Sequence, residues 1–158
     1  MGYSTDGMDQ IAEFRLPADR VYMVVAKRSA AALGSVAGFH LEAIDDLTIA
    51  VAQAFENACV CLERYGARAG EIRFVFKMVP EGLEVTVRST VNRDAELRAQ
   101  VLEVRKQAKQ REQIRREQEE VAAELALKLM GLFVDDSSYR VDQRTGGLRV
   151  RLTKYRVS

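Results

Sequence analysis

The stretch from Ile44 to Ala58 constrains the fold of this chain more than any other. Its apolar residues recur at the spacing of an α-helix that buries one face, at Ile44, Leu47, Val51, Ala54, Phe55 and Ala58. Asp45 and Asp46 near its start suit the positive end of a helix dipole. Asn57 falls beside the apolar stripe, and a buried amide needs a partner in the protein or in a bound molecule. Because buried amides are usually satisfied within the protein, the residue type alone favours a structural role for Asn57.

The composition predicts a single cytoplasmic domain. With 158 residues, 47% of them hydrophobic, the chain is long enough to bury a core. The net charge of +1 gives no indication of nucleic acid or an anionic membrane as a partner. No apolar run approaches the roughly 20 residues of a membrane span, and no secretion signal is visible. Cys59 and Cys61 would point to different faces of a helix, so we expect two reduced thiols.

Before the central helix we expect a leader, a strand and another helix. Residues 1–10 are polar and contain glycine, which is typical of a loose chain end. Residues 11–16 alternate weakly between apolar and polar side chains, which indicates an edge strand at the start of a domain that spans 11–158. Residues 19–37 are predicted to form a helix whose buried side consists of Val21, Val24, Val25, Ala32, Leu33 and Val36. Residues 38–40 link it to the central helix, which is expected to begin near Leu41.

After the central helix, alternating apolar and polar residues predict two hairpins. The first joins residues 71–79 to residues 83–91 through a Pro-Glu-Gly turn. The last joins residues 138–141 to residues 148–155, with paired glycines in the turn. Antiparallel strands that follow paired helices predict an α+β two-layer sandwich, with a sheet covered on one face by helices.

Between the hairpins, residues 93–130 contain no Gly or Pro and consist of good helix formers, which predicts a long helical insertion. Its middle is too polar for a core and has too few apolar seam positions for a coiled coil. The signs of the charges are mixed, so we expect a solvated helical arm and not a nucleic-acid-binding segment. Three early apolar residues are predicted to pack on the domain or on a second copy and to bind a partner: Leu97, Val101 and Val104.

The central stretch resembles the first nucleotide-binding motif, the N box, of the anti-sigma factor serine kinases, which belong to the histidine-kinase-like (GHKL) ATPase superfamily. The family pattern is roughly Asp-Leu-x-x-Ala-Val-x-Glu-Ala-x-x-Asn-Ala, and this chain has Asp-Leu-Thr-Ile-Ala-Val-Ala-Gln-Ala-Phe-Glu-Asn-Ala from Asp46 to Ala58. The segment from Gly147 to Tyr155 is likewise similar to the family's final strand, Gly-Thr-x-Val-x-Met-x-Lys-Tyr. The resemblance covers nearly the whole chain and is weakest over residues 92–123. It implies the GHKL fold, with the charged helix in place of the family's ATP lid.

The resemblance also implies which residues would meet ATP, and this chain departs from the family at most of them. Asn57 matches the asparagine that holds magnesium. Gln53 stands where the family has its presumed general base, a glutamate, and an amide cannot accept a proton as a carboxylate does. Glu56 is the only nearby carboxylate, but the helical rotation of about 100° per residue should turn it away from Asn57. His40, the only histidine, has no nucleophile or metal cluster around it, so no catalytic residue and no metal site are expected.

The two remaining nucleotide motifs depart from the family as well. At the adenine motif, Ser89 replaces the aspartate and the β-branched Val91 replaces the glycine. At the second glycine motif, Glu124 and Ala126 replace the two glycines, and a carboxylate there would repel a phosphate. These substitutions predict a degenerate family member that keeps its fold and has no ATP or magnesium cofactor.

Three functions therefore remain open. The first is an anti-sigma-factor-like regulator that binds a sigma factor or an anti-anti-sigma partner without ATP binding or kinase activity. The second is an active serine/threonine kinase, using ATP and Mg²⁺, that phosphorylates an anti-anti-sigma factor. The third is a scaffold or a homodimer built on the long helix. The residues of the nucleotide motifs favour the first.

Overall fold

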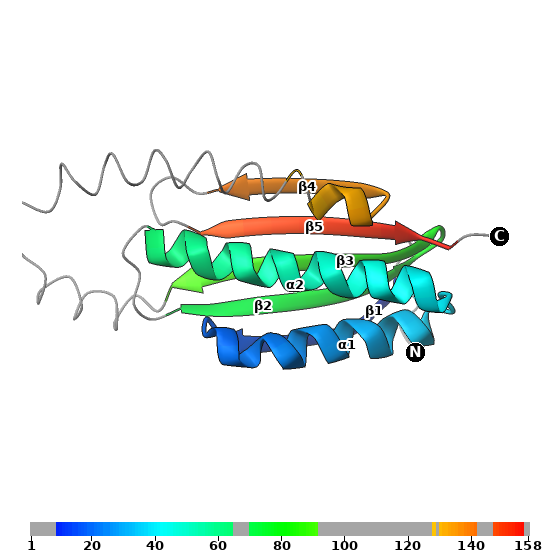
Figure 1. Cartoon of the computed structure of the whole chain (residues 1–158), viewed down its shortest axis with the longest axis horizontal. Helices are drawn as coiled ribbons and strands as arrows, with labels where there is room; N and C mark the ends of the chain where they lie inside the picture. The colour runs from blue at the N-terminus through cyan, green and yellow to red at the C-terminus, as the bar shows by residue number, and fades with distance from the viewer. Residues whose placement is uncertain (1–8, 65–69, 92–127, 129, 142–146, 157–158) are drawn as a thin grey trace, which may run out of the picture.

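The computed structural model describes residues 9–64, 70–91, 128, 130–141 and 147–156 (Figure 1). The chain begins with strand β1 (Asp9–Pro17), the 3-10 turn η1 (Arg20–Tyr22) and helices α1 (Met23–Val36) and α2 (Leu41–Arg64). It continues with strands β2 (Gly70–Val79) and β3 (Gly82–Val91), the 3-10 turn η2 (Gly131–Phe133) and strands β4 (Asp136–Val141) and β5 (Leu148–Tyr155).

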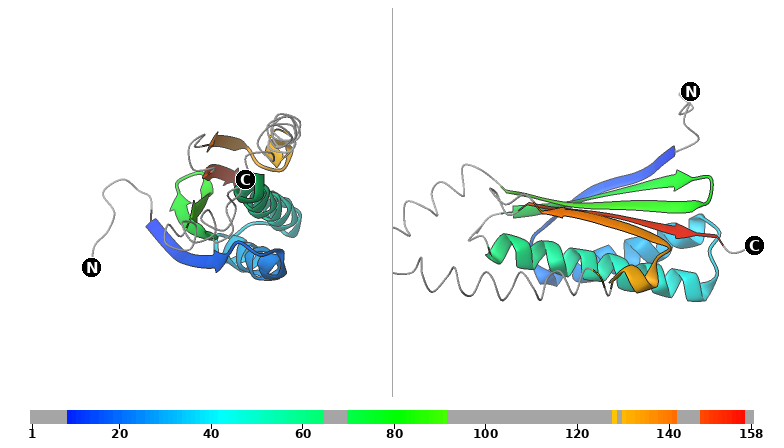
Figure 2. Two further views of the ribbon diagram at one scale, coloured as in Figure 1. Left: turned by 90° about the vertical axis from the view of Figure 1, so that its left-hand side faces the viewer. Right: turned by 90° about the horizontal axis from the view of Figure 1, so that it is seen from above.

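These strands form one five-stranded sheet in the order β1-β2-β3-β5-β4, and each neighbouring pair is antiparallel. Figure 2 shows that α1 and α2 lie on the same face of this sheet. In the part of the chain that the structure describes, no helix covers the other face. The predicted α+β two-layer sandwich is therefore confirmed, with the edge strand β1 at one side as expected.

The core lies between α2 and the sheet. The predicted apolar stripe of α2 is confirmed, because all but the partly buried Ile44 are fully buried: Leu47, Val51, Ala54, Phe55 and Ala58. Phe55 stacks on Phe74 of β2 with 6.0 Å between ring centroids. Phe74 in turn stacks on Phe14 of β1 at 4.9 Å, which extends the core to the sheet edge. Aromatic pairs at these separations add to the stabilisation by apolar burial.

The central hairpin of β2 and β3 supplies most of the inner sheet surface. Its alternation is as predicted, and the residues that face α2 are fully buried: Ile72, Phe74, Phe76, Leu83, Val85 and Val87. Gly82 after the turn is required by close packing, since a Cβ there would lie 1.9 Å from the carbonyl oxygen of Lys154 in β5. The turn thus joins two strands and also lets a third approach.

The predicted buried side of the first helix is wrong. Val21, Val24, Val25 and Val36 are all exposed, Ala32 is exposed as well, and Leu33 is only partly buried. The residues that α1 buries are Ala26, Ala30 and Gly34. The segment also begins as a 3-10 turn, in which the Asp19 side chain accepts a hydrogen bond from the backbone N–H of Val21 at 3.1 Å. The side of α1 that faces the core carries small residues, and its larger apolar residues lie on the other side.

Two predicted segments lie mainly outside the described residues. Residues 1–8 of the leader are among them. Of residues 93–130, the structure describes only Lys128 and the buried Met130, both helical. The long helix and its place in the ATP lid thus stay predictions. In the last hairpin, β4 starts at Asp136, two residues earlier than predicted, whereas β5 has the predicted bounds.

Candidate nucleotide site

Helix α2 places Asn57 on its buried side, with a relative exposure of 4%. Gln53 lies one turn earlier, and its Nε2 donates a hydrogen bond to the Oδ1 of Asn57 at 3.2 Å. The Nδ2 of Asn57 is buried and has no hydrogen-bond partner among the described residues. A buried donor without a partner typically costs about 1–3 kcal/mol. Asn57 was expected to be hydrogen-bonded within the protein, and this holds for its amide oxygen but not for its amide nitrogen.

The hydrogen bond between Gln53 and Asn57 affects how well Asn57 could act as a magnesium ligand. Mg²⁺ is held by oxygen ligands, and Oδ1 is the only oxygen of the Asn57 side chain. In this structure that oxygen accepts from an amide nitrogen of Gln53, which carries no negative charge to offset a cation. A glutamate at position 53 would instead accept a hydrogen bond from Nδ2 and leave Oδ1 for the metal. One lone pair of Oδ1 is thus used, and neither side chain of the pair supplies a negative charge to offset a magnesium ion.

Ser89 lies near the end of β3 with a relative exposure of 4%. Its Oγ accepts a hydrogen bond from the backbone N–H of Leu148 at 2.6 Å and donates to the carbonyl oxygen of the same residue at 3.4 Å. Leu148 is the first residue of β5, so the hydroxyl joins β3 to β5 one step beyond Arg88, the last β3 residue in the register with β5. At the family's adenine position, this chain thus has a side chain used within its own sheet.

Glu56 faces away from Asn57, as predicted. Its carboxylate accepts from the Nε of Arg20 in η1 at 2.9 Å, and Arg20 also contacts Glu63 two turns further along α2. Hydrogen bonds to Glu63 and Glu56 raise the pKa of the Arg20 guanidinium above its ordinary value. Glu56 therefore links η1 to α2, and its carboxylate does not take the place of the family's glutamate at position 53. Because Arg20 and Glu63 are largely exposed, this link contributes little to stability.

The comparisons with known proteins agree with the motifs. No family model matches this chain. The serine-protein kinase RsbW of Listeria innocua is 31% identical to it over 142 residues, which cover 89% of this chain and 84% of that protein. Serine-protein kinases RsbW from strains of Listeria monocytogenes have the same identity and coverage. This chain belongs to the RsbW family of anti-sigma factor serine kinases. The resemblance that its N box and last strand indicated is confirmed.

A contact that the sequence did not predict joins the two motifs of the RsbW family. Lys154 of the final strand donates from Nζ to Oδ2 of Asp46, the first residue of the N box, at 3.4 Å. The same Nζ donates to the carbonyl oxygen of Phe133 in η2 at 3.1 Å. With its side chain 13% exposed, Lys154 links β5, α2 and η2. Only the fold brings these residues together, since they are 108 positions apart.

Several predicted site residues lie outside the described part of the chain. Val91 ends β3, but its side chain is not described. The others are the phosphate positions Glu124 and Ala126 and the predicted partner-binding residues Leu97, Val101 and Val104. Among the described residues there is no group of His, Cys, Asp and Glu side chains that could hold a metal ion. Within the same residues, no helix has both the length and the apolar character needed to cross a membrane.

Cys59 and Cys61 are both buried near the end of α2 and are not joined by a disulfide. This agrees with the expectation from their spacing. Burial raises the pKa of the Cys59 thiol to about 11, although the positive charge of Arg20 opposes the shift. A protonated thiol is a poor nucleophile, so we interpret Cys59 as a residue of the hydrophobic core and not as a reactive group.

Proposed function

We propose that this protein is an anti-sigma-factor-like regulator that binds a sigma factor or an anti-anti-sigma partner in the bacterial cytoplasm, without binding ATP usefully or phosphorylating its partner. One observation carries the proposal: at two of the described nucleotide positions, Asn57 and Ser89, a side-chain oxygen bonds within the fold. The Oδ1 of Asn57 accepts a hydrogen bond from Gln53. The hydroxyl of Ser89 accepts a hydrogen bond from the backbone of Leu148. Such a protein would control transcription in a stress response by partner switching alone.

Binding of a protein partner is supported by the surface of α1 and the turn before it. Four valines are exposed there, from 40% at Val25 to 71% at Val36. Tyr22 adds a 37% exposed aromatic ring to the same segment. Apolar side chains at successive helical positions on a surface are characteristic of protein interfaces. A regulator that acts by binding needs such a surface and needs no phosphate cradle.

Calorimetry with Mg²⁺ and ATP tests the proposal, with the serine-protein kinase RsbW of Listeria innocua measured in parallel. We expect no heat of binding for this protein at micromolar concentrations. Binding in the micromolar range would overturn the proposal. Co-purification from the source cell tests the regulatory half, because a sigma factor or an anti-anti-sigma protein should be identified in the complex. Recovery of neither would count against that half.

The variant Gln53→Glu tests whether the lack of a general base is the only reason for the expected lack of kinase activity. A glutamate at position 53 restores the family's residue, but Ser89 cannot offer adenine a carboxylate. We therefore expect no transfer of phosphate from labelled ATP to an anti-anti-sigma protein by this variant. Measurable phosphorylation would show that the site is intact apart from one side chain.

An active serine/threonine kinase is the second candidate function. It is favoured by the name of the relatives, serine-protein kinase, and by the Nδ2 of Asn57, which has no partner among the described residues. In that case the unaltered protein would bind ATP and phosphorylate an anti-anti-sigma factor. The same calorimetric and phosphotransfer assays distinguish the two candidates.

A further inference from the structure

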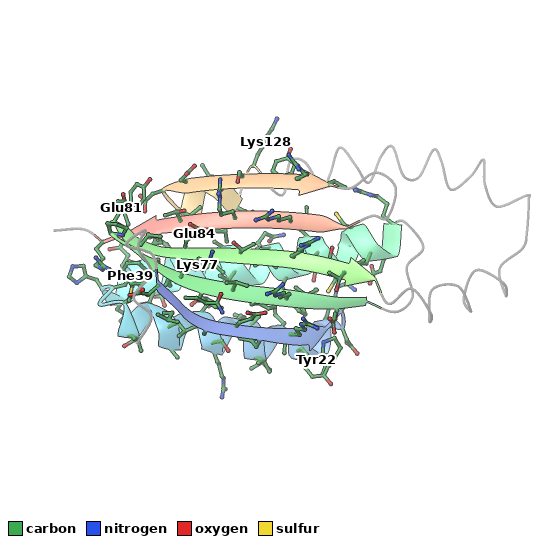
Figure 3. All side chains as sticks on the ribbon, turned by 180° about the vertical axis from the view of Figure 1, so that it is seen from behind. Tyr22, Phe39, Lys77, Glu81, Glu84 and Lys128 are labelled. Carbon is green, nitrogen blue, oxygen red and sulfur yellow. The ribbon has the colours of Figure 1, made fainter. Side chains whose placement is uncertain are left out.

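The face of the sheet opposite the helices carries a row of arginines that crosses all five strands. In the pairing register, Arg15 of β1 lies opposite Arg73 of β2, and Arg73 lies opposite Arg88 of β3. Arg88 lies opposite Arg149 of β5, and Arg149 lies opposite Arg140 of β4. Figure 3 views this face, on which Lys77 and Glu84 mark β2 and β3. No local sequence pattern shows the row, because the register of five strands creates it.

The two ends of the row differ in charge compensation. On the β1 side, Arg15 contacts Glu71 at 3.4 Å, and Arg73 forms an ion pair with Glu13 at 2.5 Å. On the other side, Arg88, Arg149 and Arg140 are exposed and have no ion pair with any described residue.

A fourth arginine strengthens the uncompensated side. Arg151 of β5 is also exposed, and it lies opposite Thr86 of β3 and Ser138 of β4, two neutral residues. We call Arg88, Arg140, Arg149 and Arg151 the arginine face. Four guanidinium groups of this face lie on three adjacent strands and form no ion pair with a described carboxylate, although Glu84 of β3 and Asp136 of β4 lie diagonally across from Arg151.

The fold itself does not explain this arrangement. Like charges directly opposite each other on neighbouring strands are destabilising. A charged residue on an edge strand can prevent edge-to-edge aggregation, which accounts for Arg140 of β4. It does not account for Arg88 and Arg149, because β3 and β5 are interior strands. Residues that lower stability without a local benefit are expected at functional sites.

We propose that the arginine face binds an acidic segment of a protein partner through its carboxylates. Neighbouring strands lie about 4.8 Å apart, so the row presents guanidinium groups at short, regular intervals. The planar fork of arginine matches a carboxylate with two parallel hydrogen bonds. A chain of Asp and Glu side chains laid across β3, β5 and β4 would thus meet a donor on each strand.

Two other occupants fit less well. Single-stranded nucleic acid is held by aromatic stacking as well as charge, and the exposed Tyr155 of β5 lies six residues along the strand from Arg149. A second copy of this chain, paired face to face, would bring like charges together. The arginine face lies on the side of the sheet away from α1 and Asn57, so the inference holds whether or not ATP binds.

The test uses the full chain and a fluorescent oligoglutamate peptide, with an oligothymidylate of matched charge as the competing probe. We expect the peptide to bind more tightly than the oligothymidylate at equal ionic strength. Its binding should weaken as the salt concentration is raised. We expect Arg88→Gln with Arg149→Gln to raise the peptide's Kd at least about tenfold, since a charge-assisted contact is lost on each of two strands. Replacing both by lysine should cause a smaller loss, because the charge remains and the fork does not.

The matched control is Lys27→Gln with Arg28→Gln, which removes the same charge from exposed residues of α1. Its Kd for the peptide should equal that of the parent. Equal weakening by both double variants, or tighter binding of the oligothymidylate, would overturn the inference. Circular dichroism and Tm show that the variants are folded, and loss of like-charge contacts should leave the Tm of the Arg88 and Arg149 variant unchanged or higher.

Discussion

Helices α1 and α2 lie side by side on one face of the sheet, but α1 buries only small residues, whereas α2 buries large residues as well as small ones. The buried side of α2 carries large side chains, including Leu47, Val51 and Phe55. The buried side of α1 consists of Ala26, Ala30 and Gly34, while its valines are exposed. The larger apolar residues of a helix therefore do not always mark the side that faces the core.

The reason is the closeness of the two helices. A Cβ added to Gly34 would lie 3.3 Å from Cγ1 of Ile44 and 3.4 Å from Cδ2 of Leu47, which leaves hardly any room for a side chain. Small residues let helix axes approach, so the contact with α2 selects alanine and glycine. Valine on the other side of α1 is then available for a different surface. The comparison teaches that volume at a helix contact decides which face is buried.

The largest expected effect comes from the large-residue side of the comparison. Phe55→Ala removes a fully buried ring that stacks on Phe74, so we expect a loss of about 3–5 kcal/mol in the free energy of unfolding. Urea unfolding followed by circular dichroism measures it. Ile49→Ala, at a 45% exposed position of the same helix, is the control and should change stability by no more than about 0.5 kcal/mol. A loss below about 1 kcal/mol for Phe55→Ala would contradict the described core.

The small-residue side should respond to added volume. Ala30 is fully buried, so Ala30→Leu must displace α2 or the sheet, and we expect a loss of about 1–3 kcal/mol. Ala32 lies two residues further along α1 and is exposed, so Ala32→Leu should be nearly neutral. Equal unfolding free energies for the two leucine variants, measured in urea, would mean that α1 does not pack closely on α2.

The buried end of α2 gives a prediction on pH. The Cys59 thiol has its pKa raised by burial from an ordinary value of 9.0 to about 11. Between these values the unfolded chain loses the thiol proton while the folded chain keeps it, so the free energy of unfolding falls as pH rises. Two pKa units correspond to at most about 2.7 kcal/mol.

Unfolding of the parent and of Cys59→Ala, measured between about pH 8 and about pH 11, isolates the thiol. All other groups that ionise in this range are common to both proteins. The alanine variant should therefore lose less stability than the parent over the same window. Parallel pH profiles would contradict a raised pKa at Cys59.

Sequence alone predicted what depends on local pattern. The stripe of α2 follows from a helical period, and the inward residues of β2 and β3 follow from strict alternation. The departures at Gln53 and Ser89 were visible because the N box and the adenine motif can be aligned residue by residue. The sequence alone therefore shows that neither position carries the family's carboxylate. What these residues do instead was not predictable.

The rest depends on contacts between distant segments. The bond of Ser89 to Leu148 needs β3 and β5 to be neighbours, although a predicted helix separates them in the sequence. The arginine face needs the register of three strands. The error on α1 arose because periodicity identifies an apolar face and not the space that is available to it. Val24 was predicted to be buried but is 49% exposed, whereas Ala26 and Ala30 are fully buried.

The smallest expected effect is that of Val24→Ala in α1, which is measured against the same substitution at Val51 in α2. Val51 is fully buried in α2, and Val51→Ala should cost about 2 kcal/mol from two lost methyl groups and the space they leave. Val24 is 49% exposed in α1, and alanine is the better helix former, so Val24→Ala should change stability by no more than about 0.5 kcal/mol in either direction. Urea unfolding of the two variants under one set of conditions gives both values. A loss for Val24→Ala as large as for Val51→Ala would mean that α1 turns its valines inward, and that the apolar surface assigned to a partner belongs to the core.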